Sequence, residues 1–292
     1  MAGLDLIKDY CMRWLSFEHD GKATFGFVKG DGVVDIGRRA PDVPDLRAAI
    51  AADRLDSLAA EAKALPADLP LAGLVYLPVI PNPGKILCAG LNYKAHQQET
   101  GRGGEPHPTI FARFAAGQVA HNQPMWRPRE SAHLDFEGEI ALIIGKAGRR
   151  IAKADWLSHV AGFAPYNDGS VRDWQRHTSQ FTPGKNFART GGFGPWMMTP
   201  DDVGDLDAME ITTRLNGEVM QNSTSALMVF GFADLVAYCS TFLPLEPGDV
   251  IVTGTPGGVG AARNPPVWMK AGDRIEIEVK PIGTLVNNVM DE

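Results

Sequence analysis

Hydrophobic residues in this sequence come mainly in short runs separated by glycine, proline and charged residues, a pattern typical of β-strands joined by turns. Between Trp14 and Ile36 the apolar segments are interrupted by Asp20-Gly21 and by the Lys-Gly-Asp-Gly sequence at 29–32. Turn residues between apolar segments predict an antiparallel β-meander with hairpin turns. Residues 44–64 are instead rich in alanine, leucine and charged side chains, and they predict one or two helices.

A proline-rich segment at 65–84 divides the chain. Its prolines remove backbone donors and discourage a continuous helix or strand. We therefore place the boundary between a small N-terminal domain, residues 12–80, and a large domain, residues 84–292, in this segment. Residues 1–11 differ in character from the β-meander after them, and we interpret them as a leader or frayed arm that carries no chemistry.

The large domain continues the pattern of short apolar runs with few helical stretches. Strands are predicted at 85–91, 161–166, 210–215, 219–221 and 274–279. Helices are predicted at 92–99, 153–160 and 226–242. Because strands outnumber helices, the pattern indicates a β-rich α+β protein.

The most unusual stretch is the apolar run at 133–145, which contains three acids. In an extended strand Asp135, Glu137 and Glu139 share one face, where their like charges repel one another. A divalent cation relieves that repulsion, and carboxylates without nearby cysteine favour a hard ion such as Mg²⁺ or Mn²⁺. Asp168, in a turn-like Asn-Asp-Gly sequence, offers a third ligand. The alternative is a half-exposed strand whose acids are simply solvated.

A second candidate site lies in the helix predicted at 92–99. His96 and Glu99 are three residues apart and share a helix face, so the carboxylate is able to orient the imidazole and stabilise its protonated form. This is the arrangement of a general base with its orienting partner. A solvated surface pair is the alternative that the spacing leaves open.

Further polar residues are candidates for binding an anionic substrate. Arg172, Gln175 and Lys185 each offer donors to an anionic oxygen, although ordinary surface ion pairs explain them equally well. The glycine loop at 253–260 lacks the lysine and the glycine spacing of a phosphate-binding loop, which argues against a nucleotide site. We expect its N–H groups and the Thr255 hydroxyl to bind a carboxylate.

Composition narrows the class of protein. The 292 residues are 44% hydrophobic, enough to bury a sizeable core, and the net charge of −7 without a long basic run argues against a nucleic-acid partner. The 3 cysteines show no C-x-x-C spacing, which favours a reducing compartment, and we expect the cytoplasm. No apolar stretch approaches the length of a membrane span, so no membrane association is expected.

Several motifs together resemble the fumarylacetoacetate hydrolase superfamily, in particular its branch of bacterial acylpyruvate hydrolases and 2-hydroxyhepta-2,4-diene-1,7-dioate isomerases. They are D-F-E-G-E-I-A-L-I-I-G-K, N-D-G-S-V-R-D-W-Q, G-K-N-F, L-N-G-E-V-M-Q and V-T-G-T-P-G-G-V-G, which occur in the family's order and at similar separations. The resemblance covers about residues 84–290. It implies a mixed β-roll catalytic domain, a small N-terminal α/β domain and a homodimer.

The resemblance also assigns roles to individual residues. Glu137, Glu139 and Asp168 match the acids that bind one Mg²⁺ or Mn²⁺ per subunit in that family. The segment N-Y-x-x-H-x-x-E is similar to the one that carries the water-activating dyad, here His96 and Glu99. Remaining positions match a lysine beside the metal (Lys185) and a substrate-binding threonine (Thr255). The segment 108–114 resembles a family strand whose lysine is here replaced by Arg113, and we expect Arg113 to contact the substrate.

The function that these features favour is hydrolysis of a carbon–carbon bond in a 2,4-dioxo acid of the acylpyruvate or fumarylpyruvate type, releasing pyruvate and a carboxylic acid during breakdown of aromatic or sugar acids. The small-molecule 2-oxo acid would be chelated by the metal. Because decarboxylation of oxaloacetate, keto-enol tautomerisation and diene isomerisation all pass through an enolate, a lyase or isomerase is the main alternative. An alternative of another class is a non-catalytic protein that binds a dicarboxylate.

Overall fold

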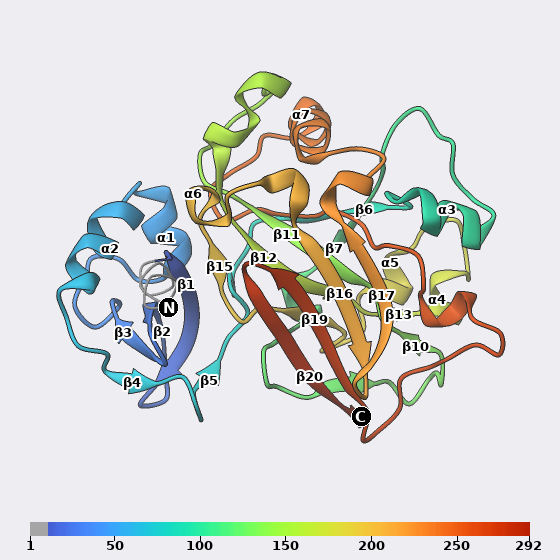
Figure 1. Ribbon diagram of the computed structural model, residues 1–292, viewed down its shortest axis with the longest axis horizontal. Coiled ribbons are helices and arrows are strands. Elements are labelled where there is room, and N and C mark those ends of the chain that lie inside the picture. The colour runs from blue at the N-terminus through green and yellow to red at the C-terminus, as the bar shows by residue number, and fades with distance from the viewer. Residues whose placement is uncertain (1–10) are drawn as a thin grey trace, which may run out of the picture.

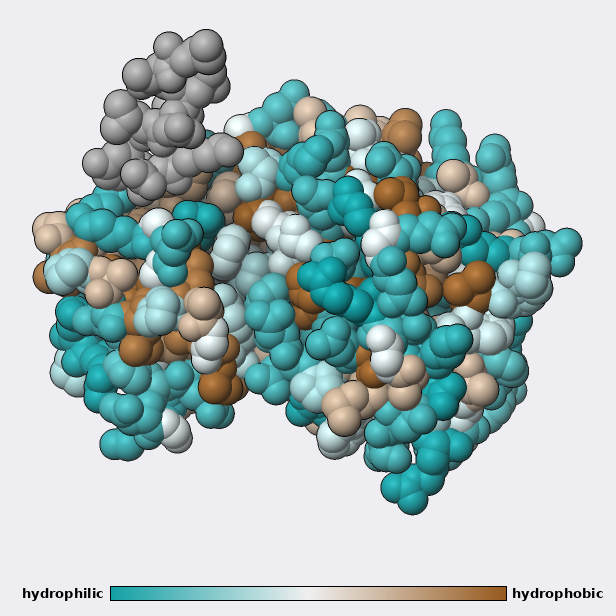
Figure 2. Space-filling view, turned by 60° about the horizontal axis from the view of Figure 1, so that its bottom comes forward, coloured by the Kyte–Doolittle hydropathy of each residue, from teal (hydrophilic) through white to brown (hydrophobic). Residues whose placement is uncertain are grey.

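A computed structural model describes residues 11–292 of the chain (Figure 1). The predicted leader at 1–11 lies outside these residues except for Cys11. A smaller N-terminal lobe, blue in Figure 1, adjoins a larger body that holds the rest of the chain. Figure 2 shows a face on which hydrophobic side chains are dispersed among hydrophilic ones. No helix in the described part of the chain is long and apolar enough to cross a bilayer.

The N-terminal lobe confirms the predicted meander and helices. Its elements are β1 (Arg13–His19), β2 (Lys22–Lys29), β3 (Gly32–Asp35), α1 (Leu46–Ala51), α2 (Leu55–Lys63), β4 (Leu69–Pro70) and β5 (Val75–Tyr76). Asp20, at a φ of 52°, and Gly21 form the turn between β1 and β2. The Asp45 side chain caps α1 by accepting a hydrogen bond from the Ala48 N–H at 2.7 Å.

The N-terminal strands continue into the main sheet of the body. Further strands of this sheet are β6 (Ile86–Gly90), β7 (Thr109–Arg113), β8 (Gln118–Ala120), β11 (Gly138–Ile144), β12 (Val160–Asp168), β14 (Gly191–Phe193), β15 (Met197–Met198) and β18 (Val250–Val252). Within residues 11–292 they form a 13-stranded sheet with the principal order β4-β3-β2-β1-β15-β12-β11-β18-β6-β7. The antiparallel pair β1 and β15 joins the lobe to the body, and one buried cluster contains Trp14 and Phe25 together with Ala141 and Val250.

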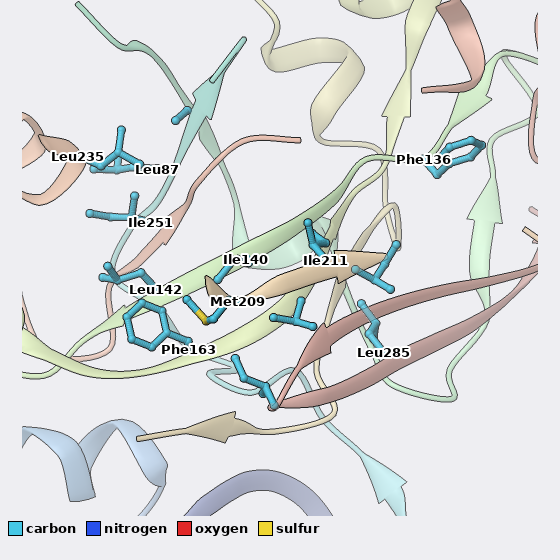
Figure 3. Packing of buried hydrophobic residues seen from close by; sticks show 14 of the residues in the cluster. Leu87, Phe136, Ile140, Leu142, Phe163, Met209, Ile211, Leu235, Ile251 and Leu285 are labelled. Atoms are coloured by element: carbon cyan, nitrogen blue, oxygen red, sulfur yellow. The ribbon is translucent and has the colours of Figure 1, made fainter. Parts of the chain in front are cut away.

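A second sheet packs across β11 and β12. Its strands are β9 (Met125–Arg127), β16 (Glu210–Leu215), β17 (Glu218–Thr224), β19 (Arg274–Lys280) and β20 (Gly283–Asp291). Side chains from both sheets fill the space between them, and Figure 3 shows Ile140 and Leu142 of β11 close to Met209 and Ile211. Alternating inward-facing residues of the two sheets thus build one apolar core. The protein is strand-rich with mixed sheets, as the sequence predicted.

The helices of the body are short. They are α3 (Lys94–Thr100), α4 (Arg172–Gln175), α5 (Thr182–Lys185), α6 (Pro200–Val203), α7 (Phe232–Phe242), η2 (Ala115–Gly117), η3 (Lys153–His159), η4 (Leu206–Ala208), η5 (Ser225–Leu227) and η6 (Gly260–Ala262), where η denotes a 3₁₀ turn. The helix predicted at 226–242 begins only at Phe232, because Gly231 is its N-cap and donates its N–H to the Asp234 carboxylate at 3.1 Å. Figure 1 shows α3, α4 and α5 on the side of the body away from the N-terminal lobe.

The predicted acidic strand at 133–145 is interrupted. Leu134 and Asp135 form a short strand, β10, that pairs with β13 (Ser170–Val171), and β11 starts only at Gly138. Asp135 therefore does not share a strand face with Glu137 and Glu139. The chain breaks there because Asp135 points to a separate set of partners, described below.

Candidate active site

A cavity of about 420 Å³ opens between α3, the α4–α5 segment, the ends of β11 and β12 and the glycine loop. Its volume is within the range of small-molecule sites. Of the ten residues predicted for the site, all in the described part of the chain, nine line the cavity and Arg113 does not. The nine are His96, Glu99, Glu137, Glu139, Asp168, Arg172, Gln175, Lys185 and Thr255.

Three buried carboxylates meet at the inner end of the cavity. One oxygen from each of Glu137, Glu139 and Asp168 lies within 4.8 Å of the others, and none of the three residues is more than 4% exposed. The antiparallel pairing of β11 and β12 brings them together, since the Asp168 N–H donates to the Glu137 carbonyl at 2.8 Å. Three hard oxygen donors in one buried cluster fit a divalent ion such as Mg²⁺ or Mn²⁺.

Two cations hold Glu137 in its charged form. Lys185 Nζ bridges Glu137 Oε2 at 2.5 Å and Asp168 Oδ2 at 2.6 Å, and an Arg172 nitrogen lies 2.7 Å from Glu137 Oε1. Burial opposes ionisation of Glu137, but the charges of Arg172 and Lys185 outweigh it and hold the pKa well below its usual value. This carboxylate is ionised throughout the neutral range.

Glu139 is held differently. Within residues 11–292 no cation pairs with it, and its Oε2 accepts only the Gly254 N–H, at 2.5 Å. Burial, followed by the charges of Asp168 and Glu137, raises its pKa well above the usual value. Glu139 is thus a buried carboxyl group that has no cation of its own among the described residues, next to two carboxyl groups that do. A divalent ion bound by all three would supply the missing positive charge.

Arg113 lies behind the carboxylates instead of facing the cavity. Its fully buried guanidinium donates to Asp168 Oδ1 at 2.5 Å, to the Gly169 carbonyl at 3.0 Å and to Thr190 Oγ1 at 2.9 Å. The sequence predicted a substrate contact at this position. The geometry instead makes Arg113 a residue that orients Asp168, since its planar guanidinium donates to three fixed acceptors at once, which a lysine ammonium group would not do in the same geometry.

The predicted base dyad faces the same cavity. His96 Nδ1 lies 2.7 Å from Glu99 Oε1, and Glu99 Oε2 accepts the Gly258 N–H at 2.7 Å. In the described part of the chain no hydrogen bond engages His96 Nε2, although the side chain is buried at the cavity wall. This leaves Nε2 as the ring atom available for proton exchange with a bound molecule.

The glycine loop binds the protein's own acids. Besides Gly254 and Gly258, the N–H groups of Gly260 and Ala261 donate to Asp135 at 2.8 and 3.0 Å. The Thr255 hydroxyl donates to the Gly138 carbonyl at 2.9 Å. These groups were expected to bind a substrate carboxylate, but in this structure they already donate to acceptors of the protein. Thr255 nevertheless lines the cavity.

Two functional contacts were missed by the sequence reasoning. Asp135 accepts a hydrogen bond from Arg172 Nε at 2.8 Å and so fixes the arginine that reaches Glu137. The Gln221 amide donates to Thr255 Oγ1 at 2.8 Å and accepts the Gly138 N–H at 3.0 Å. Neither contact has a local signal, because the partners are far apart in the sequence.

This chain is similar in sequence to known proteins over most of its length. Residues 85–290 match the family model described as fumarylacetoacetate hydrolase C-terminal. The chain is 38% identical over 265 residues to a mitochondrial oxaloacetate tautomerase of Rattus norvegicus, with 89% of this chain and 85% of the relative covered.

Two solved structures are similar to this chain over nearly its whole length. A fumarylacetoacetate hydrolase from Exiguobacterium antarcticum aligns with a TM-score of 0.80 at 31% identity, covering 96% of this chain and all of the other. A maleylpyruvate hydrolase from Sphingobium sp. SYK-6, solved with manganese(II) and pyruvate, aligns with a TM-score of 0.80 at 26% identity, covering 96% of this chain and 99% of the other.

Proposed function

Because the chain belongs to the fumarylacetoacetate hydrolase family, we propose that it is a metal-dependent enzyme that interconverts the keto and enol forms of a 2-oxo dicarboxylic acid of the oxaloacetate type. The observation that carries this proposal is that a buried carboxylate triad and a His-Glu dyad share one cavity. The identity to oxaloacetate tautomerases supports enolisation as the reaction.

Glu137, Glu139 and Asp168 would hold Mg²⁺ or Mn²⁺. When bound, the ion supplies Lewis acidity that favours an enolate over its ketone. Lys185, beside the triad, adds a fixed positive charge where the carboxylate and the C2 oxygen of the substrate would lie. Arg113 and Arg172 keep two of the ligand carboxylates in position.

His96 carries the proton. Its Nε2 takes a proton from C3 of the 2-oxo acid, the C–H electron pair becomes the C2–C3 double bond, and the π pair of the C2 carbonyl moves to its oxygen. Nε2 then gives the same proton to this oxygen, which yields the enol and regenerates the neutral imidazole. Glu99 stabilises the imidazolium formed during this transfer and fixes the ring through Nδ1. The reverse path runs through the same atoms.

A second candidate is the hydrolysis favoured by the sequence. The same Nε2 is positioned to take a proton from water that attacks the distal carbonyl of a 2,4-dioxo acid, after which the carbon–carbon bond breaks and pyruvate leaves as its enolate. The structural similarity to a maleylpyruvate hydrolase supports this reaction.

Product analysis by NMR separates the two candidates. Purified enzyme with saturating Mg²⁺ or Mn²⁺ is given either enol oxaloacetate or an acylpyruvate. We expect accelerated enol-to-keto conversion of oxaloacetate with little cleavage of the acylpyruvate. Rapid release of pyruvate from the acylpyruvate, with no effect on the enol, would favour the hydrolase.

A further inference from the structure

We infer that Arg102 and Arg176, at the mouth of the cavity, bind the second carboxylate of a 2-oxo dicarboxylate and thereby select dicarboxylates over monocarboxylates. This inference rests on the proposed function, because it assumes that the 2-oxo acid end of the substrate lies against the carboxylate triad.

Depth within the cavity separates two positively charged regions. Lys185 is 1% exposed and Arg172 6% exposed, and both are paired with the buried acids. Arg102 and Arg176 line the same cavity but are exposed to solvent. A substrate whose 2-oxo acid end lies beside Lys185 would therefore extend toward these outer arginines.

Arg102 and Arg176 are free to pair with an acidic ligand, because the described part of the chain offers them no carboxylate partner. Of the acids that line the cavity, Glu137 and Asp168 pair with buried cations, Glu99 with His96 and the Gly258 N–H, and the deeply buried Glu139 accepts the Gly254 N–H. Within residues 11–292, no carboxylate lies within ion-pair distance of Arg102 or Arg176. Two guanidinium groups without acidic partners beside one cavity attract a second negative charge.

An aromatic side chain brings the two segments together. The Arg102 guanidinium lies over the Phe181 ring, 5.9 Å from its centre, and Phe181 packs edge-on against Phe111 with ring centres 5.6 Å apart. Phe181 follows Arg176 in the same connection between α4 and α5, so the connection after α3 and this one meet at the cavity. The stacking restricts Arg102, which lowers the entropy lost when it binds a carboxylate.

The test compares two stable ligands that differ only at one end. 2-Oxoglutarate ends in a carboxylate where 2-oxopentanoate ends in a methyl group. Calorimetric titration of the Mn²⁺-loaded protein measures their Kd for wild type, Arg102→Gln and Arg176→Gln. The matched control is Arg149→Gln, because Arg149 is exposed and is not among the residues that line the cavity.

We expect wild type to bind 2-oxoglutarate more tightly than 2-oxopentanoate. Each cavity variant should weaken 2-oxoglutarate binding about tenfold, as loss of a hydrogen bond to a charged group predicts, and leave 2-oxopentanoate unchanged. Arg149→Gln should alter neither Kd.

Equal affinity of wild type for the two ligands, or an equal loss of both ligands in the cavity variants, would overturn the assignment of the arginines. If neither ligand binds while Mn²⁺ does, the proposed 2-oxo acid function itself fails, and the inference fails with it.

Discussion

Lys185→Met should destabilise the metal-free protein and increase the stabilisation that a divalent ion provides. Lys185 is 1% exposed and bridges Glu137 and Asp168 at 2.5 and 2.6 Å. Removing one partner of a buried ion pair costs about 3–5 kcal/mol. For a protein of this size the melting temperature should fall by roughly 10 °C.

The metal should recover much of this loss. Without the lysine, Arg172 and Arg113 still pair with Glu137 and Asp168, but the cluster has lost one positive charge, so a divalent ion neutralises more uncompensated negative charge and no longer meets the Lys185 ammonium group. A tenfold tighter Kd adds about 1.4 kcal/mol of metal-dependent stabilisation at a fixed excess of metal.

Scanning calorimetry at one fixed pH, with EDTA or with excess Mn²⁺, measures both effects. Lys85→Met is the matched control, since Lys85 pairs with the buried Asp249 at 2.7 Å and does not line the cavity. It should lower stability without changing the Mn²⁺-dependent increment. The same increment in Lys185→Met and wild type would refute the reasoning.

Three other features of the structure make testable predictions. Dialysis against EDTA should abolish turnover and Mg²⁺ or Mn²⁺ should restore it, because the site is built from carboxylates; full activity after exhaustive chelation contradicts the metal site. Gly258→Ala should lower turnover about tenfold or more, since a Cβ there meets a backbone oxygen at 2.3 Å and shifts the N–H that holds Glu99; Gly272→Ala, also at positive φ but in open space, serves as its control in steady-state assays. Burial and a nearby arginine lower the pKa of His121 to about 4, and its ring accepts the Val286 N–H. The unfolded state therefore binds more protons than the folded state between about pH 6.5 and 4, and the free energy of unfolding should fall by up to about 3 kcal/mol as the pH drops through that window. Urea unfolding of His121→Asn, which keeps an acceptor, should show a flatter pH dependence.

The parts of the site that the sequence predicted are set by local geometry. Glu137 immediately precedes β11 and Glu139 lies in it, and His96 and Glu99 are three apart on a helix, so each pair is close in the sequence and could be predicted from local spacing. Asp168 lies at the end of β12, which pairs with β11 and so places this third acid beside the other two. The meander and the short helices of the N-terminal lobe were predictable for the same reason.

Contacts between distant segments were not predictable in this way. The Gly258 N–H reaches Glu99 across 159 positions, and the Gly260 N–H reaches Asp135 across 125. No periodicity indicates that a glycine loop will bind the protein's own acids instead of a ligand. Arg113 is a further example. Its charge predicted an anionic partner, but the sequence alone did not indicate that this partner is Asp168 instead of the substrate.

The most direct test of the account is the rate of enol-to-keto conversion of oxaloacetate by wild type, His96→Ala and Glu99→Gln at saturating Mg²⁺. The account predicts a loss of roughly 10²–10⁴-fold for His96→Ala, the usual contribution of a positioned general base. Glu99→Gln should lose less, because the imidazole remains and only its orientation and the stabilisation of its cation are weakened. Conversion by His96→Ala at the wild-type rate would contradict the assignment of His96 as the group that moves the proton.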